Sequence, residues 1–90
     1  MGIERKYKDP NETISFGVDW SEYLGAATIS SSSWIIPSGV TQVASSNTTS
    51  KATIMLGGGT LGNIYRITNR INTSAGEMLD QSIDIEVIEK

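Results

Sequence analysis

The chain of 90 residues contains no cysteine and no histidine. Without cysteine it can form no disulfide bond, no thiolate nucleophile and no cysteine-ligated zinc site. Without histidine it lacks the most common general base and metal ligand, and with them the Ser/His arrangements of nucleophilic enzymes. A chain of this size buries only about 60–65% of its unfolded surface, which leaves little room for an enclosed active site. The sequence therefore predicts a protein that is not an enzyme and holds no cofactor or metal.

Positive charge and long apolar runs are scarce as well. Seven Lys and Arg residues stand against ten Asp and Glu residues, for a net charge of −3, whereas nucleic-acid-binding proteins usually present a basic surface. No run approaches the ~18 apolar residues of a membrane-spanning helix, and no hydrophobic region follows the charged start as it does in a signal peptide. We expect no nucleic-acid partner, no membrane partner, and a chain kept in the cytoplasm until it joins an assembly.

What the sequence does contain is short segments in which apolar and polar residues alternate. Ile14, Phe16, Val18 and Trp20 share one face of a predicted strand, because successive side chains of a strand point to opposite sides. Such segments recur roughly every ten residues with turn residues between them, and no window carries the 3.6-residue period of a long helix. One helical turn or a compact corner is expected in DWSEYLG. The pattern predicts an antiparallel β-sandwich or a small barrel.

The clearest element is a predicted hairpin near the C-terminus. In NIYRITNRINT alternate residues point to one face of the predicted strand, and these are Tyr65, Ile67, Asn69 and Ile71. The loop SAGE places Gly76 where positive φ is required, and alternation resumes over residues 79–87. Tyr65 resembles the tyrosine of immunoglobulin-like sandwiches whose hydroxyl bonds back to the main chain, which is a structural role.

The middle of the chain is rich in serine and threonine. In ATISSSSWIIP, Ile29 has an odd number and Trp34 an even number, so in a regular strand their side chains would point to opposite faces. Both can face one core only if the strand takes up an extra residue between them, and a β-bulge is therefore predicted within Ser30–Ser33. The segment VTQVASSN is a weak strand that we place at a sheet edge. Residues 24–64 contain one charged side chain, Lys51.

Three glycines in MLGGGTLGNIYRITNR have the spacing of a dinucleotide-binding loop. Gly57, Gly59 and Gly62 spell G-x-G-x-x-G, a pattern that binds pyrophosphate only when a helix begins directly after it. Here the following residues alternate with the period of a strand, so no helix N-terminus is available for an anion. The glycines are interpreted as a turn between two strands.

Five residues are candidates for contact with a partner protein. Trp20 lies at a strand end beside a turn, where it could be half-exposed with Tyr23 and Leu24 and anchor a partner; core packing is the alternative. Arg66 and Arg70 face outward from one strand and are candidates for contact with an acidic partner, with a solvated strand face as the alternative. Asp84 and Glu86 also fall on a solvated face.

Four stretches of the chain are together distinctive: KDPNETISFGVDWSEYLG, TISSSSW, LGGGTLGNIYRITNRINTSAGE and SIDIEV. In this order they resemble small virion proteins of tailed bacteriophages and prophages, described as fibre-tail adaptors of the head–tail region. The resemblance runs from Lys8 nearly to the C-terminus. It implies an immunoglobulin-like β-sandwich that works by contact with other virion proteins, with no catalytic residues to transfer.

The combined prediction is an N-terminal tail or edge segment over residues 1–12, followed over residues 13–90 by one antiparallel immunoglobulin-like sandwich of six or seven strands with Greek-key connections.

The predicted function is that of a non-enzymatic phage or prophage virion structural protein, an adaptor in the head–tail or tail-fibre region that is oligomeric only on assembly. It would be located in the virion, and in the host bacterial cytoplasm during assembly. The alternative is a carbohydrate- or surface-binding module with Trp20 or Tyr23 as a stacking platform. The predicted core consists of Phe16, Val18, Ile29, Trp34, Ile36, Ile54, Leu56, Tyr65, Ile67, Ile71, Ile83, Ile85 and Val87.

Overall fold

The computed structural model describes residues 3–90, which form seven strands and one helix of a single turn. In chain order the elements are β1 (Glu4–Lys8), β2 (Ile14–Asp19), α1 (Ser21–Leu24), β3 (Ile29–Ile35), β4 (Val40–Asn47), β5 (Lys51–Gly58), β6 (Ile64–Thr73) and β7 (Met78–Val87). Within these residues no helix is long and apolar enough to cross a membrane.

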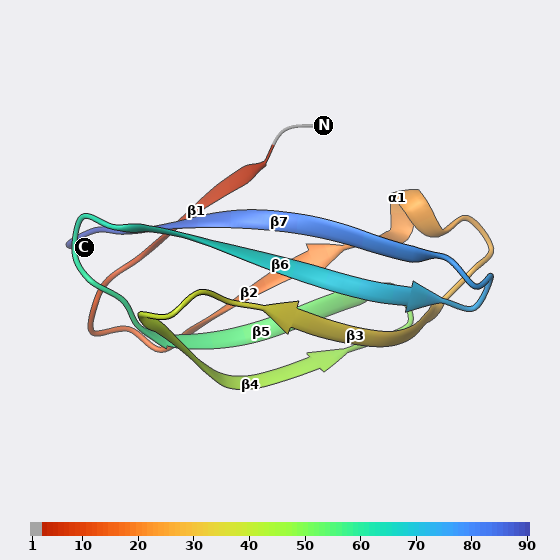
Figure 1. The fold of residues 1–90 in the computed structure, drawn as a ribbon, viewed down its shortest axis with the longest axis horizontal. Helices are drawn as coiled ribbons and strands as arrows, with labels where there is room; N and C mark the ends of the chain where they lie inside the picture. Colours follow the sequence, from red (N-terminus) through yellow and green to blue (C-terminus); the bar gives the residue numbers. More distant parts are fainter. Residues whose placement is uncertain (1–2) are drawn as a thin grey trace.

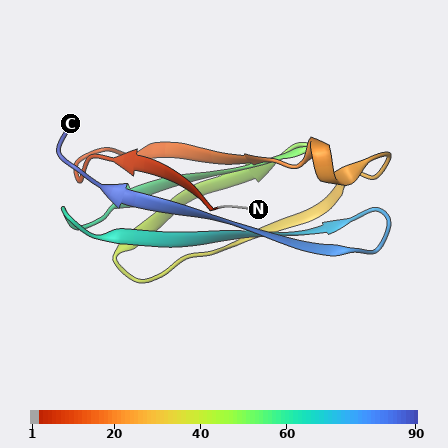
Figure 2. The ribbon, with the colours of Figure 1, turned by 90° about the horizontal axis from the view of Figure 1, so that it is seen from above.

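The strands form two sheets that pack face to face (Figures 1 and 2). The four-stranded sheet has the order β1-β7-β6-β3, and the three-stranded sheet has the order β2-β5-β4. Neighbouring strands are antiparallel except β1 and β7, which are parallel. Because β2, β3 and β4 alternate between the sheets, the connections are of the Greek-key type. The predicted immunoglobulin-like β-sandwich of six or seven strands is confirmed, but the expectation of purely antiparallel pairing is wrong for the edge strand β1, which runs parallel to β7.

Alternation along each strand decides which side chains fill the space between the sheets. On β5, Ala52, Ile54 and Leu56 point inward and have no exposed surface, and on β6 the same holds for Ile67 and Ile71. All the predicted core residues lie in the packed clusters, with Trp34 and Ile36 only partly buried. The core also contains Trp20, Leu24 and Val40, which were not among the predicted core residues.

Two bulges interrupt the strand register. The pairing of β3 with β6 shifts at Ser30, within the serine run where the parity of the flanking apolar residues predicted a bulge. That prediction is confirmed: one extra residue lets both ends of β3 face the same core. A second shift occurs in β4 at Val43. It was not predicted, because the alternation of this strand is too weak to reveal a change of parity.

The glycine cluster forms the connection between β5 and β6, as predicted. Gly59 has φ of 99°, and a Cβ atom added there would lie 2.9 Å from Cγ2 of Val87. Only glycine fits this position, because the backbone is left-handed and the neighbouring strand lies too close for a side chain. The hydroxyl oxygen of Tyr65 accepts a hydrogen bond from the backbone N–H of Thr60 at 2.9 Å, so its predicted bond back to the main chain is confirmed.

The N-terminal segment contributes the edge strand β1, whose last residue is fully buried. The Lys8 ammonium donates hydrogen bonds to the carbonyl oxygens of Gly58 at 2.7 Å and of Asp9 at 2.9 Å. The backbone N–H of Ile88 in turn donates to the carbonyl oxygen of Lys8 at 2.8 Å. Loss of hydration on burial lowers the pKa of Lys8 below its ordinary value. Lys8 therefore joins the start of the fold to the glycine turn and to the C-terminal strand.

Candidate interaction surfaces

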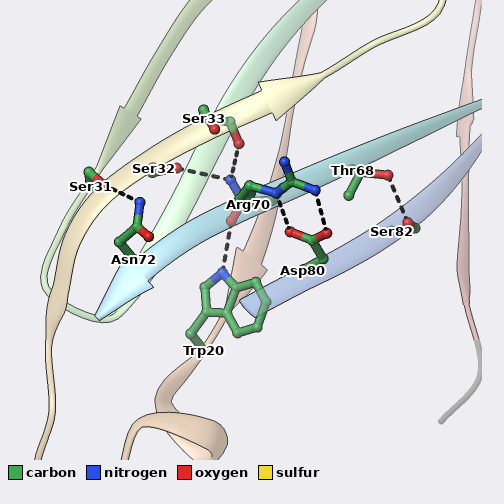
Figure 3. A network of polar contacts seen from close by, with 10 residues as sticks. Trp20, Ser31, Ser32, Ser33, Thr68, Arg70, Asn72, Asp80 and Ser82 are labelled. Atoms are coloured by element: carbon green, nitrogen blue, oxygen red, sulfur yellow. Dashed lines mark hydrogen bonds and ion pairs between the residues drawn. The ribbon is translucent and has the colours of Figure 1, made fainter. Parts of the chain in front are cut away.

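The outer face of the four-stranded sheet carries the two predicted arginines. Arg66 donates two hydrogen bonds to the Asp84 carboxylate, at 2.8 and 3.1 Å. Arg70 likewise donates two to Asp80, both at 2.9 Å, and this second pair is drawn in Figure 3. The hydrogen bonds from each guanidinium lower the pKa of the paired aspartate below its ordinary value. The strand parity correctly places Arg66 and Arg70 outward, but each is already paired with a carboxylate of β7.

Other cross-strand pairs continue this pattern over the same face. The hydroxyls of Thr68 and Ser82 lie 2.8 Å apart, and the Asn72 amide donates to the Ser31 hydroxyl at 2.9 Å (Figure 3). We call this surface the ladder face; its members are Arg5, Ser31, Arg66, Thr68, Arg70, Asn72, Asp80, Ser82, Asp84 and Glu86. Its polar side chains bond mainly to one another across neighbouring strands, and this leaves few of them unpaired for a partner.

Trp20 and Leu24, two of the predicted partner contacts, lie in the core instead. Trp20 is 2% exposed and Leu24 8% exposed. Trp20 follows Phe16 and Val18 on the inward side of β2, so its ring continues the core stripe rather than leaving it at the turn. The prediction of a surface role is wrong for both residues in this structure, and Trp20 is equally unavailable as a stacking platform for a sugar.

The Trp20 indole takes part in a buried polar network that joins the two sheets. Its Nε1–H donates to Oδ1 of Asn69 on β6 at 2.8 Å, and Asn69 Nδ2 donates to the Ser32 hydroxyl at 2.9 Å and to the Ser33 carbonyl at 3.0 Å (Figure 3). Asn69 has no exposed surface. Its amide is satisfied on both sides, so this polar group is compatible with burial. By contrast, Trp34 Nε1 is buried without a hydrogen-bond partner within residues 3–90.

Tyr23 is the aromatic residue of the α1 corner that remains at the surface. Its side chain is 43% exposed, and its ring packs edge-on against Trp20, with centroids 5.9 Å apart and an interplanar angle of 71°. Edge-to-face packing of this kind holds an aromatic ring in a defined position. Of the three predicted contacts at this corner, only Tyr23 is placed where a partner could touch it, and that role stays a prediction.

The outer face of the three-stranded sheet has a different chemistry. We call it the small-residue face; its members are Ser15, Gly17, Thr41, Val43, Ala44, Ser46, Thr53, Met55 and Gly57. Charge occurs only at one end of the sheet, where Asp19 and Lys51 pair across β2 and β5. Every ion pair found among residues 3–90 involves β1, β6, β7 or the chain ends. Sequence reasoning did not single out this face, although the near absence of charge over residues 24–64 was its signal.

One shallow cavity of about 330 Å³ opens between β1, β2 and β7. Two carboxylates, Glu4 and Asp19, are the charged groups in its lining, beside Gly17, Val18, Gln81 and Ile83. Residues 3–90 contain no cluster of three or more His, Cys, Asp or Glu side chains positioned for a metal ion. The cavity therefore presents neither a set of metal ligands nor an aromatic platform.

Comparison with known proteins agrees with this architecture. No curated protein matches the chain. The solution structure of the PKD domain from KIAA 1837 protein is similar to this chain with a TM-score of 0.57 and 21% identity, covering 98% of this chain and 81% of that one. At this identity the similarity concerns the fold, which is an immunoglobulin-like sandwich in both.

The sequence also matches a protein family directly. The match covers residues 8–86 and is to the family described as "Podophage GP4 fiber-tail adaptor protein gp77". It spans most of the chain, from the end of β1 almost to the end of β7, and confirms the resemblance found in the sequence motifs. This chain belongs to the podophage fiber-tail adaptor family Gp77.

Proposed function

We propose that this protein is a non-enzymatic structural subunit of a phage virion that connects other virion proteins in the head–tail or tail-fibre region by direct contact. Membership of the fiber-tail adaptor family over residues 8–86 is the observation that carries this proposal. The fold is compatible with it, since a small sandwich with a packed interior offers its surfaces and strand edges to neighbours.

The proposed adaptor forms its oligomer on the assembling particle. A particle presents several copies of each docking site at fixed spacing, and simultaneous weak contacts then give firm attachment. A single subunit needs only modest affinity for each neighbour. The subunit would accumulate in the host bacterial cytoplasm and end in the virion.

The experiment that tests this proposal uses a phage whose copy of this gene is deleted and supplied from a plasmid. Particles assembled with the gene should contain the protein by mass spectrometry, and particles assembled without it should lack tail fibres or stable tails in negative-stain electron microscopy. Particles of normal composition and infectivity in the absence of the gene would refute the adaptor role. A plasmid carrying the gene with an early stop codon is the matched control.

A further inference from the structure

The sandwich has four edge strands, β1 and β3 in one sheet and β2 and β4 in the other. They differ in how well they are protected against pairing with a strand of another chain. β4 ends the three-stranded sheet and pairs only with β5. In an antiparallel edge strand, every second residue directs its backbone N–H and C=O away from the sheet. The eight residues Val40–Asn47 extend over about 26 Å at the usual rise of a strand. Seven of them have exposed side chains, and only Val40 is buried.

The usual protections of an edge strand are nearly absent from β4. Proteins commonly guard such edges with charged residues or proline, because an open edge accepts a strand from another chain. The opposite edge of the same sheet, β2, has one charged residue, Asp19, and β1, an edge of the other sheet, has four charged residues out of five. β4 has neither charge nor proline. β3 is also uncharged, but its Ser31 and Ser32 hydroxyls already accept hydrogen bonds from Asn72 and Asn69.

The bulge at Val43 divides β4 and marks where a new strand would lie. After the bulge, Ala44–Asn47 pair with β5 in regular register. The Val43 side chain is 54% exposed and lies over the small-residue face, 3.6 Å from the position of a Cβ atom built on Gly57. A partner strand along Ala44–Asn47 would therefore meet hydroxyl and small apolar side chains. Charged side chains of this sheet lie only beyond the Asn47 end of that stretch, where Asp19 pairs with Lys51. A charged side chain placed beside Val43–Ser46 would therefore meet no counter-charge on this face.

We propose that β4 is the docking edge of this adaptor, and that it receives an extended, uncharged segment of another virion protein as a fourth strand of the β2-β5-β4 sheet. The main-chain bonds would form along Ala44–Asn47, with Val43 as the apolar contact beside them. This inference rests on the proposed adaptor function and assigns a surface to it. It also gives the two outer faces different roles. The polar side chains of the ladder face bond to one another, whereas no hydrogen bond joins the hydroxyl side chains of the small-residue face among residues 3–90.

A lysine placed on the edge tests the proposal without touching the core. Ser46 is exposed on the outer side of β4, and Ser46→Lys adds the kind of charge that protects natural edges. Ser33→Lys is the matched control, because Ser33 is an exposed serine of the other uncharged edge strand, β3. Both variants should retain the circular dichroism spectrum and the melting temperature of the wild type to within a few degrees, which verifies that they fold.

Incorporation into particles is then measured in the gene-deleted phage described above. We expect wild type and Ser33→Lys to incorporate equally and Ser46→Lys to fall at least tenfold. Equal incorporation of Ser46→Lys refutes the docking edge and leaves the adaptor function intact, and loss of both variants refutes the assignment to β4. Failure of the wild type itself to enter particles refutes the adaptor function instead.

Cross-linking identifies the occupant of the edge. Because the chain has no cysteine, Ser46→Cys provides a single attachment point for benzophenone-4-maleimide, which is activated by light within assembled particles. The expected product joins this chain to a different virion protein through a peptide without charged residues. A product between two copies of this chain, or a charged peptide at the cross-link, overturns the proposed partner chemistry.

Discussion

Replacing Asn69 by leucine tests whether the buried amide holds the two sheets in register. Asn69 is fully buried and makes three hydrogen bonds, to Trp20, Ser32 and Ser33. Leucine has a similar size but bonds to none of them. The half-buried Ser32 hydroxyl can turn to water, whereas the Trp20 N–H and the Ser33 carbonyl lose their partner. At ~1–3 kcal/mol for each of these two unsatisfied groups, we expect Asn69→Leu to lower the free energy of unfolding by about 2–6 kcal/mol.

The assay is urea denaturation followed by tryptophan fluorescence and circular dichroism, with thermal melting as a second measure. For a domain of this size each kcal/mol corresponds to ~4–8 °C, so a loss of ~3 kcal/mol lowers the melting temperature by roughly 12–24 °C. Asn72→Leu is the control, because Asn72 is an exposed asparagine of the same strand whose amide bonds to an exposed serine. It should change stability by no more than about 0.5 kcal/mol.

The two tryptophans supply a second comparison. Trp20→Phe removes the indole N–H that bonds to Asn69, whereas Trp34→Phe removes an N–H that has no partner. We expect Trp20→Phe to be the more destabilising, and the double variant Trp20→Phe/Asn69→Leu to be less destabilised than the sum of its single variants, with a coupling of ~1–2 kcal/mol. Equal stability of Asn69→Leu and Asn72→Leu, or strict additivity in the double variant, would refute this account of the network.

Three further predictions concern the turn, the buried lysine and the ladder face. Gly59→Ala should destabilise the protein by about 1–3 kcal/mol in urea denaturation. Its effect should exceed that of Gly62→Ala, because both glycines have positive φ but, of the two, only Gly59 has a neighbour within 4 Å of an added Cβ atom. Equal effects would contradict the close approach of Gly59 to β7. Because burial lowers the pKa of Lys8, the unfolded chain binds more protons than the folded one between that lowered pKa and about pH 10.4, and wild-type stability should rise with pH over this range. Lys8→Met should reduce stability at pH 7, because the carbonyls of Asp9 and Gly58 lose their donor, and it should abolish this part of the rise. The folded pKa values of Asp80 and Asp84 lie below their ordinary value. Their ion pairs with Arg70 and Arg66 should therefore stabilise the protein above about pH 3.9 and lose this contribution as the pH falls through the folded pKa. An Asp80→Asn/Asp84→Asn variant with the same acid unfolding profile as wild type would contradict this expectation.

The strands, the hairpin and the glycine turn could be predicted because each depends on local pattern. The alternation around Ile54 and Ile67 is strict, and a strand with one buried face has little freedom of register. The bulge at Ser30 followed from parity alone. In each case the residues that determine the structure are neighbours in the sequence.

The contacts that were missed join residues far apart in the sequence. Nothing near Lys8 shows that its ammonium will meet the carbonyl of Gly58, 50 positions away. The partner of Trp20 is 49 positions away, although Asn69 on a core-facing parity was a signal that a buried donor or acceptor must be near it. The aspartates opposite Arg66 and Arg70 depend on the hairpin register, which the loop length did not fix.

The parallel pairing of β1 with β7 has a mechanical consequence. Glu4 lies opposite Ile83 and Lys8 opposite Val87, so the chain enters this pair at one end and leaves it at the other (Figure 1). A force that draws the two ends of the domain apart acts along both strands and loads their hydrogen bonds together, in shear, rather than one after another. Lys8, bonded to the glycine turn, adds a side-chain bond at the Val87 end of that pair. The domain is therefore built to resist extension between its ends.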